Sequence, residues 1–265
     1  MVIASKQNPQ IRQVRALSNR KSRRETGLFF VEGIRLVGEA VQLEASIATL
    51  IVAPELLTSS FGHEVVRDAQ QAGIPHFDVT SDVFRHISQK DGPQGLAAIV
   101  RQKWHDLETV TEDSTLGWVV LEEVRNPGNL GTILRTCDAV GGAGVILLGD
   151  STDPFDPAAV RGSMGALFSQ KLVRTDRTQL TEWINAGDIN MVGASDDAPI
   201  EYTDMRYERP TILCMGNEQH GLSTEYRSLC RDVVRIPMVG RSDSLNLAVA
   251  TGVILYEIFN QHKDI

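Results

Sequence analysis

The sequence predicts an α/β protein with a small N-terminal domain and a larger C-terminal domain built on a mostly parallel sheet. Short apolar runs that suit strands alternate with segments of helical periodicity along most of the chain. The 265 residues are enough for two domains of ordinary size. With 42% hydrophobic and 23% charged residues, the composition is typical of globular proteins.

The first part of the chain has the pattern of a small α/β unit. Residues 34–44 carry an apolar side at helical spacing, and residues 62–73 end on a glycine, as helices often do. The expected strands are short apolar runs at 28–33, 48–53, 76–79 and 95–100. A polar stretch over 101–115 is interpreted as a linker, so we expect domains at 1–106 and 107–265.

The second part opens with a strand at 117–124, a helix at 126–142 and a strand at 143–149. Apolar side chains recur at i, i+3, i+4 and i+7 from Leu130 to Cys137, which is one face of a helix. A strand–turn–helix–strand order predicts parallel pairing of the two strands. Further strands are expected at 189–195, 211–216 and 233–238.

The last predicted helix carries polar residues at its start. From Leu245 to Phe259 the segment is apolar nearly all round, which predicts burial on most sides. Asn246 lies inside this segment, and a buried amide needs hydrogen-bond partners, which a ligand or a neighbouring loop could supply. Ser244 is a candidate N-cap.

Composition also bounds the function. No window of 18 apolar residues suits a membrane helix, and the N-terminus lacks the apolar core of a signal peptide. The cysteines, Cys137, Cys214 and Cys230, lie far apart without metal-binding spacing, so we expect free, mostly buried thiols, no metal site and a reducing cytoplasm.

The net charge of −8 argues against a protein that coats nucleic acid over its whole surface. The first 24 residues nevertheless contain no acid and a run of cations: Arg12, Arg15, Arg20, Lys21, Arg23 and Arg24. A local basic patch can bind phosphate even on an acidic protein, because screening makes nearby charges matter most. A solvated helix face explains the same run equally well.

Three polar clusters rich in glycine follow predicted strands: 126–135, 215–223 and 239–246. Ligands of open α/β sheets bind beyond the carboxyl ends of strands, so these clusters are candidate site loops. Asn129 could instead cap a helix, Arg135 could face solvent, and Glu218 could be an ordinary loop acid. Neither a dinucleotide fingerprint nor a P-loop is present, and the G-x-S-x-G and H-E-x-x-H motifs are also missing.

Taken together, the three clusters resemble the SpoU–TrmH family of RNA ribose 2′-O-methyltransferases. The first resembles its Asn-x-Gly-x-x-x-Arg motif at Asn129–Arg135, and the second its Gly-x-Glu-x-x-Gly-Leu motif at Gly216–Leu222. The third resembles its Ser-Leu-Asn-x-x-x-Ala motif at Ser244–Ala250, and 161–168 is also similar to the family. The resemblance spans roughly residues 117–257.

The N-terminal part resembles, more loosely, the small substrate-binding domain often attached to this family, which has a ribosomal-protein-like α/β fold. The residues that carry this resemblance are the basic run ending at Arg24 and the segment 29–40. This resemblance makes Arg20, Arg23, Arg24 and Arg35 candidates for binding RNA.

The resemblance implies a trefoil knot in the C-terminal domain, bound S-adenosylmethionine and a homodimer through the C-terminal domain. Knots are rare by general topology rules, so the knot rests on the resemblance alone. The apolar C-terminal helix suits such an interface. Carried over by position, Gly216, Ile236 and Leu245 would contact the cofactor through backbone groups, and Met238 would line the adenosine pocket.

The resemblance also assigns catalytic roles. Arg135 would act on the 2′-hydroxyl. Because arginine stays protonated, we expect it to bind the adjacent phosphate and to stabilise the alkoxide charge that develops. The proton acceptor is left open between that phosphate and water. Asn129 and Glu218 would orient Arg135 and the RNA, while Ser244 and Asn246 would bind the substrate or fix the loop.

We therefore expect a cytoplasmic, S-adenosylmethionine-dependent RNA 2′-O-methyltransferase that acts on 23S ribosomal RNA in preference to transfer RNA. The preference rests on family association. The alternatives are the same chemistry on transfer RNA, methylation of a base nitrogen, a non-catalytic RNA-binding or ribosome-assembly factor, and a small-molecule methyltransferase. The acidic segment 149–156 does not match the family, which puts RNA contacts there in doubt.

Overall fold

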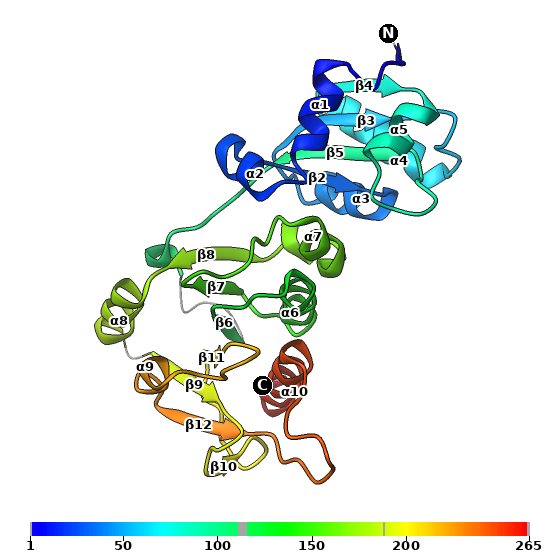
Figure 1. Cartoon of the computed structure of the whole chain (residues 1–265). Helices are drawn as coiled ribbons and strands as arrows, with labels where there is room; N and C mark the ends of the chain where they lie inside the picture. The colour runs from blue at the N-terminus through cyan, green and yellow to red at the C-terminus, as the bar shows by residue number, and fades with distance from the viewer. Residues whose placement is uncertain (1, 111–115, 188, 264–265) are drawn as a thin grey trace. The chain divides into compact units, whose positions relative to one another are not determined.

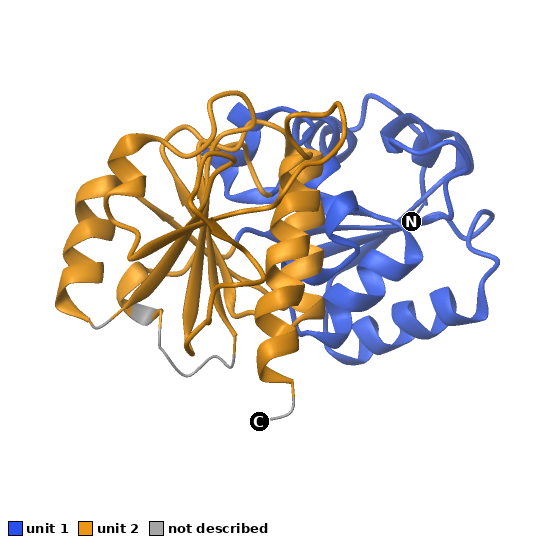
Figure 2. Ribbon diagram, turned by 90° about the horizontal axis from the view of Figure 1, so that it is seen from below, with its two compact units in different colours: residues 1–102, 155–168 blue, residues 103–154, 169–265 orange. Residues whose placement is uncertain are grey.

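The computed structural model describes residues 2–110, 116–187 and 189–263, and its contacts group them into two compact units. Unit 1 comprises Met1–Gln102 and Phe155–Phe168, and unit 2 comprises Lys103–Pro154 and Ser169–Ile265 (Figure 2). A short segment from the second half of the sequence therefore folds into unit 1.

Unit 1 is built on a mixed five-stranded sheet. The strands run in the order β1 (Val2–Ile3), β4 (His76–Val79), β3 (Ile47–Val52), β5 (Leu96–Arg101), β2 (Leu28–Glu32). β5 is antiparallel to both of its neighbours, and the other pairs are parallel. The helices are α1 (Pro9–Ala16), α2 (Arg20–Thr26), α3 (Ile34–Gln42), α4 (Ser60–Gln71) and α5 (Ser81–Ile87).

The core of unit 1 forms because α1 and α5 present apolar side chains to one face of this sheet. Ile11 and Val14 of α1 and Phe84 of α5 are fully or almost fully buried with Ile51 of β3. These side chains recur at helical spacing, which is the signal of an amphipathic helix. α2 does not share this pattern, because all of its residues are polar.

The segment 155–168 carries α7 (Pro157–Ser163) and the short 3₁₀ helix η2 (Ala166–Phe168). It joins unit 1 through an aromatic cluster, in which the ring centroid of Phe29 lies 4.8 Å from that of Phe155 and 6.4 Å from that of Phe168. Asp156 caps α7 by accepting a hydrogen bond from the Ala158 N–H at 2.9 Å. Aromatic burial of this kind contributes a large share of a small core.

Arg23 has a structural place in unit 1, which corrects the expectation that it binds RNA at the surface. The residue is 1% exposed, and its guanidinium donates to the carbonyl oxygens of Leu17 and Ser18, both at 2.9 Å. It also forms a 3.2 Å ion pair with Asp156. A buried charge must be paired and hydrogen-bonded, and these contacts satisfy that need.

Unit 2 is built on a seven-stranded sheet in which every pair is parallel. The strands run in the order β10 (Ile200–Glu201), β12 (Asp232–Arg235), β9 (Asn190–Ala194), β11 (Thr211–Met215), β6 (Gly117–Glu122), β7 (Gly144–Leu148), β8 (Lys171–Thr175). The carboxyl ends of all these strands consequently lie at one edge of the sheet.

Helices cover both faces of this sheet (Figure 1). On one face α6 (Pro127–Ala139) packs beside α10 (Leu247–His262), and on the other lie α8 (Arg177–Ala186) and α9 (Thr224–Arg227). A 3₁₀ helix, η1 (Leu107–Thr109), precedes the sheet. Apolar strands buried on both faces are what a parallel sheet requires.

The structure confirms the mixed α/β class and the mostly parallel sheet. The predicted strands at 117–124, 143–149 and 211–216 correspond to β6, β7 and β11, with ends shifted by one or two residues. β8 and α8 were not predicted, and neither were α5, α7, α9 and the two-residue strands β1 and β10. Part of the proposed linker, residues 111–115, lies outside the described residues. The trefoil knot stays a prediction.

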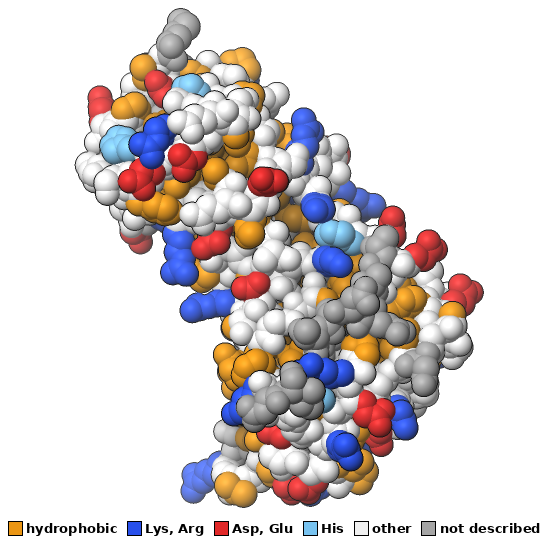
Figure 3. Space-filling view, turned by 180° about the vertical axis from the view of Figure 1, so that it is seen from behind, with side chains coloured by type: hydrophobic (Ala, Val, Ile, Leu, Met, Phe, Trp, Pro, Cys, Tyr) orange, Lys and Arg blue, Asp and Glu red, His pale blue; other side chains and the backbone are white. Residues whose placement is uncertain are grey.

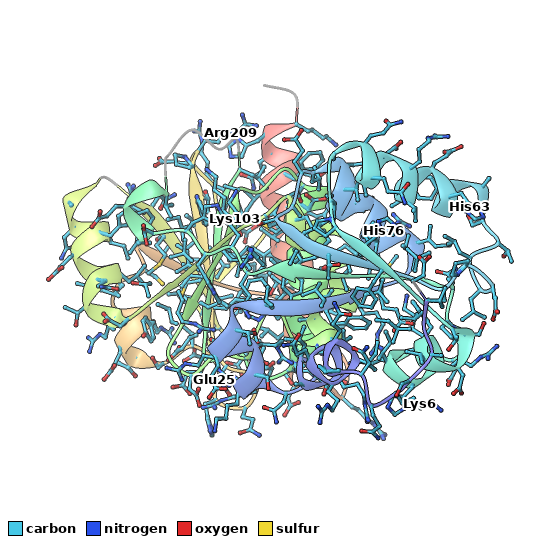
Figure 4. The ribbon with its side chains drawn as sticks, turned by 90° about the horizontal axis from the view of Figure 1, so that it is seen from above. Lys6, Glu25, His63, His76, Lys103 and Arg209 are labelled. Atoms are coloured by element: carbon cyan, nitrogen blue, oxygen red, sulfur yellow. The ribbon has the colours of Figure 1, made fainter. Side chains whose placement is uncertain are left out.

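The described surface is mixed in charge. On the face drawn in Figure 3, lysine and arginine side chains lie among acidic ones. On α2, for example, Lys21 pairs with Glu25 at 3.9 Å, and Glu25 is labelled in Figure 4. Among the described helices, none has both the length and the apolar character needed to span a membrane.

Replacing Arg23 should destabilise the protein. We expect Arg23→Ala to lower the free energy of unfolding by about 2–3 kcal/mol, less than the usual cost of breaking a buried pair, because Asp156 keeps a third of its side chain in water. Arg24→Ala, at the exposed neighbouring position, should change it by less than about 0.5 kcal/mol. Urea unfolding followed by circular dichroism measures both, and equal stability of the two variants would contradict the assigned burial.

Candidate functional site

The candidate site in unit 2 lies at the carboxyl ends of four adjacent strands, β12, β9, β11 and β6. The loops after β11 and β12 contain two of the predicted clusters, and the third cluster begins α6 directly after β6. Parallel pairing brings the start of α6 to the loops after β11 and β12, although Asn129 is 89 residues from Glu218 and 117 residues from Asn246 in the sequence. This is the place where ligands bind in open α/β sheets.

The turn between β6 and α6 holds the carboxylate of Glu218. Its oxygens accept hydrogen bonds from the backbone N–H groups of Arg125 at 3.1 Å and of Asn126 at 3.2 Å. Asn126 is also the N-cap of α6, because its side chain accepts from the N–H groups of Gly128 and Asn129. Asn129, the expected alternative cap, therefore has its side chain available for another contact.

A chain of side-chain hydrogen bonds links the three predicted clusters. Asn129 Nδ2 donates to Glu218 Oε1 at 3.0 Å, and Asn129 Oδ1 accepts from Asn246 Nδ2 at 3.0 Å. Asn246 in turn is the N-cap of α10, since its Oδ1 accepts from the N–H groups of Ala248 and Val249. The N-cap is therefore Asn246 and not Ser244. The amide uses both of its ends, which explains its place at the start of an apolar helix.

This network changes the proton affinity of Glu218. Partial burial would by itself raise the pKa of Glu218, but the hydrogen bonds from the Arg125 N–H, the Asn129 side chain and the Asn126 N–H outweigh it, so the pKa lies below its ordinary value. Hydrogen bonds to a carboxylate favour its charged form. Glu218 is thus an anion at neutral pH and acts as an acceptor in the site.

The loops after β9, β11 and β12 enclose a cavity of about 380 Å³. This volume falls in the range of small-molecule sites, roughly 300–1,000 Å³. The cavity is lined by all four residues expected to bind the cofactor: Gly216, Ile236, Met238 and Leu245. Ser244 and Glu218 line it as well, whereas Arg135, Asn129 and Asn246 are outside its lining.

The cavity has an acidic lining. Asp196, Asp243 and Glu218 contribute carboxylates, and the described residues that line it include neither lysine nor arginine. Opposite charges attract more strongly near a protein surface than in bulk water. The cavity therefore suits a cationic or zwitterionic ligand better than an anionic one.

Gly216 is required where the loop after β11 turns back on itself. A Cβ atom at this position would lie 2.1 Å from the backbone of Gly221 and of Leu222, which is closer than real Cβ contacts come. The loop is closed by mutual backbone hydrogen bonds between Asn217 and Gly221, both 2.9 Å. Only glycine allows this close approach.

Arg135 lies on the exposed side of α6. Within the part of the chain that the structure describes, no hydrogen bond or ion pair involves its side chain. The next residue, Thr136, faces Gly252 of α10, whose added Cβ would meet Thr136 Cγ2 at 3.6 Å. Arg135 therefore remains available to bind a ligand from outside unit 2.

The other predicted RNA-binding residues lie in unit 1. Arg20 and Arg24 are exposed on α2, and Arg35 is exposed in the first turn of α3. Gly33 precedes α3 as its N-cap with φ at 108°, a backbone conformation that residues with a side chain rarely adopt. These three arginines are placed where a ligand in solution can reach them.

The sequence analysis missed the loop after β9. Ser195 and Asp196 follow β9 directly and line the cavity, although the predicted strand, 189–195, includes Ser195. The signal that identified the other loops, polar residues at the end of a strand, was present here as well. It was overlooked because the loop contains no glycine.

Comparison with known proteins identifies relatives of both halves of the chain. Residues 118–256 match the SpoU rRNA methylase family, and residues 8–98 match the MRM3-like substrate binding domain. The chain is 32% identical to the 23S rRNA (uridine(2479)-2′-O)-methyltransferase of Streptomyces viridochromogenes, over 92% of this chain and 87% of that protein. It is 26% identical to the 23S rRNA (guanosine(2553)-2′-O)-methyltransferase RlmP of Bacillus subtilis, over 97% of this chain and 98% of that protein.

Solved structures give the same result. An AdoMet-bound rRNA methyltransferase from Sinorhizobium meliloti superposes with a TM-score of 0.89 at 36% identity, covering 97% of each chain. The SpoU methyltransferase AviRb from Streptomyces viridochromogenes, in complex with AdoMet, superposes with a TM-score of 0.86 at 32% identity, over 96% of this chain and 98% of that one. The fold is therefore shared along almost the whole chain.

The lowered pKa of Glu218 makes its contribution to stability depend on pH. The pKa of Glu218 in the folded protein lies below its ordinary value of 4.5. Ionised Glu218 therefore contributes its full stabilisation of the fold above pH 4.5, and this contribution is lost as the pH falls through the lowered pKa. We expect the difference in unfolding free energy between wild type and Glu218→Gln to be constant near neutrality and to shrink below pH 4.5. Urea unfolding across this range measures it, and a difference that stays constant in acid would contradict the assigned network.

Proposed function

The chain belongs to the SpoU rRNA methylase family, and we propose that it methylates a ribose 2′-hydroxyl of 23S ribosomal RNA with S-adenosylmethionine as methyl donor. The observation that carries the proposal is the Glu218–Asn129–Asn246 network beside the acidic cavity. The network places residues from all three motif loops next to a cavity of the right size for the cofactor.

The cavity fits S-adenosylmethionine in charge as well as in size. The cofactor carries a sulfonium and an ammonium group against one carboxylate, so it is a net cation, and Asp196, Asp243 and Glu218 favour a cation. When bound, it supplies an electrophilic methyl group. Gly216, Ile236 and Leu245 would hold it mainly through backbone groups, and Met238 would line the adenosine end.

Arg135 is the residue that we propose to act on the RNA. It lies on the helix whose first turn carries Asn129, about 9 Å further along the helix axis. A guanidinium has donors only, so it cannot accept the proton of the 2′-hydroxyl. It can grip the adjacent phosphate and stabilise the negative charge that develops on the ribose oxygen.

The remaining site residues would orient the reactants. Asn129 and Glu218 fix the start of α6 and thereby the position of Arg135 and the RNA. Ser244 lines the cavity and Asn246 begins α10, so both are placed to bind the ribose or to fix the loop around it. Holding a donor and a hydroxyl in line can supply much of the rate.

Unit 1 would bind the RNA away from the reacting nucleotide. The match to a substrate-binding domain and the exposed positions of Arg20, Arg24 and Arg35 support this role, with Arg23 as part of the core. We propose a domain boundary at residues 106 and 107, between the two matched segments, whereas the compact units divide after Gln102 and unit 1 also includes Phe155–Phe168. Phosphate contacts of this kind supply affinity without sequence specificity.

We further propose that the enzyme is a homodimer through the C-terminal domain. Val249 and Tyr256 of α10 are 52% and 48% exposed, and they lie two turns apart on one side of the helix. An apolar stripe of this kind suits a permanent interface better than free solvent. The three cysteines are free thiols, which is consistent with action in the cytoplasm.

The experiment that tests the proposal is methyl transfer from labelled S-adenosylmethionine to RNA from a strain that lacks the protein. We expect label in 23S ribosomal RNA, at one linkage that becomes resistant to alkali. Arg135→Ala should reduce the transfer by about 100-fold or more, the loss typical of removing an electrostatic stabiliser. Cofactor affinity, measured by calorimetry, should change less than twofold, because Arg135 does not line the cavity.

Each alternative function gives another outcome. Label in transfer RNA would identify transfer RNA as the substrate, and label on a base nitrogen would exclude methylation of the ribose. Binding of RNA and cofactor without transfer to any RNA fraction would indicate a non-catalytic factor. Failure to bind the cofactor would contradict the methyltransferase assignment for this chain.

A further inference from the structure

Arg125 lies in the turn between β6 and α6, and two carboxylates hold its guanidinium. Its Nη2 is 2.8 Å from Glu123 Oε2, and its Nη1 is 3.2 Å from Asp150 Oδ2. Glu123 follows β6 directly and Asp150 lies two residues beyond β7, so the arginine ties together the carboxyl ends of two neighbouring strands. Asp150 belongs to the acidic segment 149–156, which lies within the residues 118–256 that match the family.

The same turn holds the loop after β11 at two places. The backbone N–H groups of Arg125 and Asn126 donate to Glu218, and the carbonyl oxygen of Glu123 accepts from Asn217 Nδ2 at 2.8 Å. Glu123 has φ at 47°, a left-handed conformation that is uncommon for a residue other than glycine. Such a conformation persists only where surrounding contacts hold it.

We propose that Arg125 is a positioning residue, whose ion pairs with Glu123 and Asp150 hold the turn in the shape that presents its N–H groups to Glu218. The inference rests on the proposed function, because it assigns this turn to the methylation site. It gives Asp150 a role in the protein itself, as a carboxylate that fixes Arg125.

The direction of the side chain supports this assignment. The backbone N–H of Arg125 points to Glu218 while its guanidinium is held by Glu123 and Asp150. The ion pairs with the two carboxylates therefore fix the side chain of the residue whose backbone N–H binds Glu218.

The test compares Arg125→Gln, Asp150→Asn and the double variant. We expect each single variant to lower kcat by about 10- to 100-fold, because small misplacements of a site have effects of this size. The double variant should be no worse than the single ones, since both break the same unit. KM for RNA and the Kd for S-adenosylmethionine should change less than twofold, and Tm by less than about 4 °C because the ion pairs are exposed.

Arg231→Gln is the matched control. Arg231 also forms an exposed ion pair in unit 2, 3.4 Å from Glu208, and it lies away from the cavity lining. Its kcat should stay at the wild-type value. Unchanged kcat in Arg125→Gln and Asp150→Asn would overturn the inference. A rise in KM for RNA in Arg125→Gln alone would overturn it as well, because it would show direct RNA binding by Arg125.

A second readout separates this inference from the proposed function. Carboxyl-carbon NMR follows the titration of Glu218, assigned by its loss in Glu218→Gln, without RNA or cofactor. Loosening the turn weakens hydrogen bonds that lower the pKa of Glu218, so the pKa should rise in Arg125→Gln and Asp150→Asn. A wild-type enzyme inactive on every RNA would refute the proposed function alone, while an unshifted Glu218 titration would refute the positioning role.

Discussion

The carboxylate of Glu218 connects the start of α6, the loop after β11 and, through Asn129, the start of α10. Asn129 is 89 residues from Glu218 and 117 residues from Asn246 in the sequence, so their meeting depends on the parallel sheet and on a few polar contacts at its edge. Asn129 is a buried amide that must satisfy its donors and its acceptor, and it does so with Glu218 and with the exposed Asn246, whose own oxygen accepts from helix N–H groups. The network therefore makes the start of two helices dependent on one loop.

The charged side chains of the protein are distributed in a way that suits two different ligands, a cationic cofactor and an RNA. The cavity is lined by carboxylates and suits a cationic cofactor, while the arginines available to RNA lie outside it, on α6 and in unit 1. This separation reconciles a net charge of −8 with an RNA substrate. A basic cavity lining would repel the cofactor, and a uniformly basic surface would bind RNA without placing it at the site.

The sequence was sufficient to predict the parallel sheet and most of the cavity lining, because both follow from short-range patterns. Apolar runs locate β6, β7 and β11, and glycine-rich polar loops after strands locate Gly216 and Leu245. Residue type alone does not distinguish Asn126 from Asn129 as the cap, and the local signal for Asn126, Pro127 at the first helical position, was overlooked. The hydrogen bonds of Asn129 to Glu218 and Asn246 could not be predicted, because they depend on the fold. The burial of Arg23 depends on its ion pair with Asp156, which is 133 residues away in the sequence, and no local sequence pattern predicts such a contact.

The most direct test of this account is the kcat of Asn246→Ser relative to wild type. Serine caps a helix about as well as asparagine, so α10 should keep its stability to within a few tenths of a kcal/mol. A serine is too short to reach Asn129 as the amide does, so the link between α10 and Asn129 is lost. If the network assembles the site, kcat should fall by about tenfold or more at unchanged stability. A serine variant with wild-type kcat would show that Asn246 only caps the helix and would contradict the account.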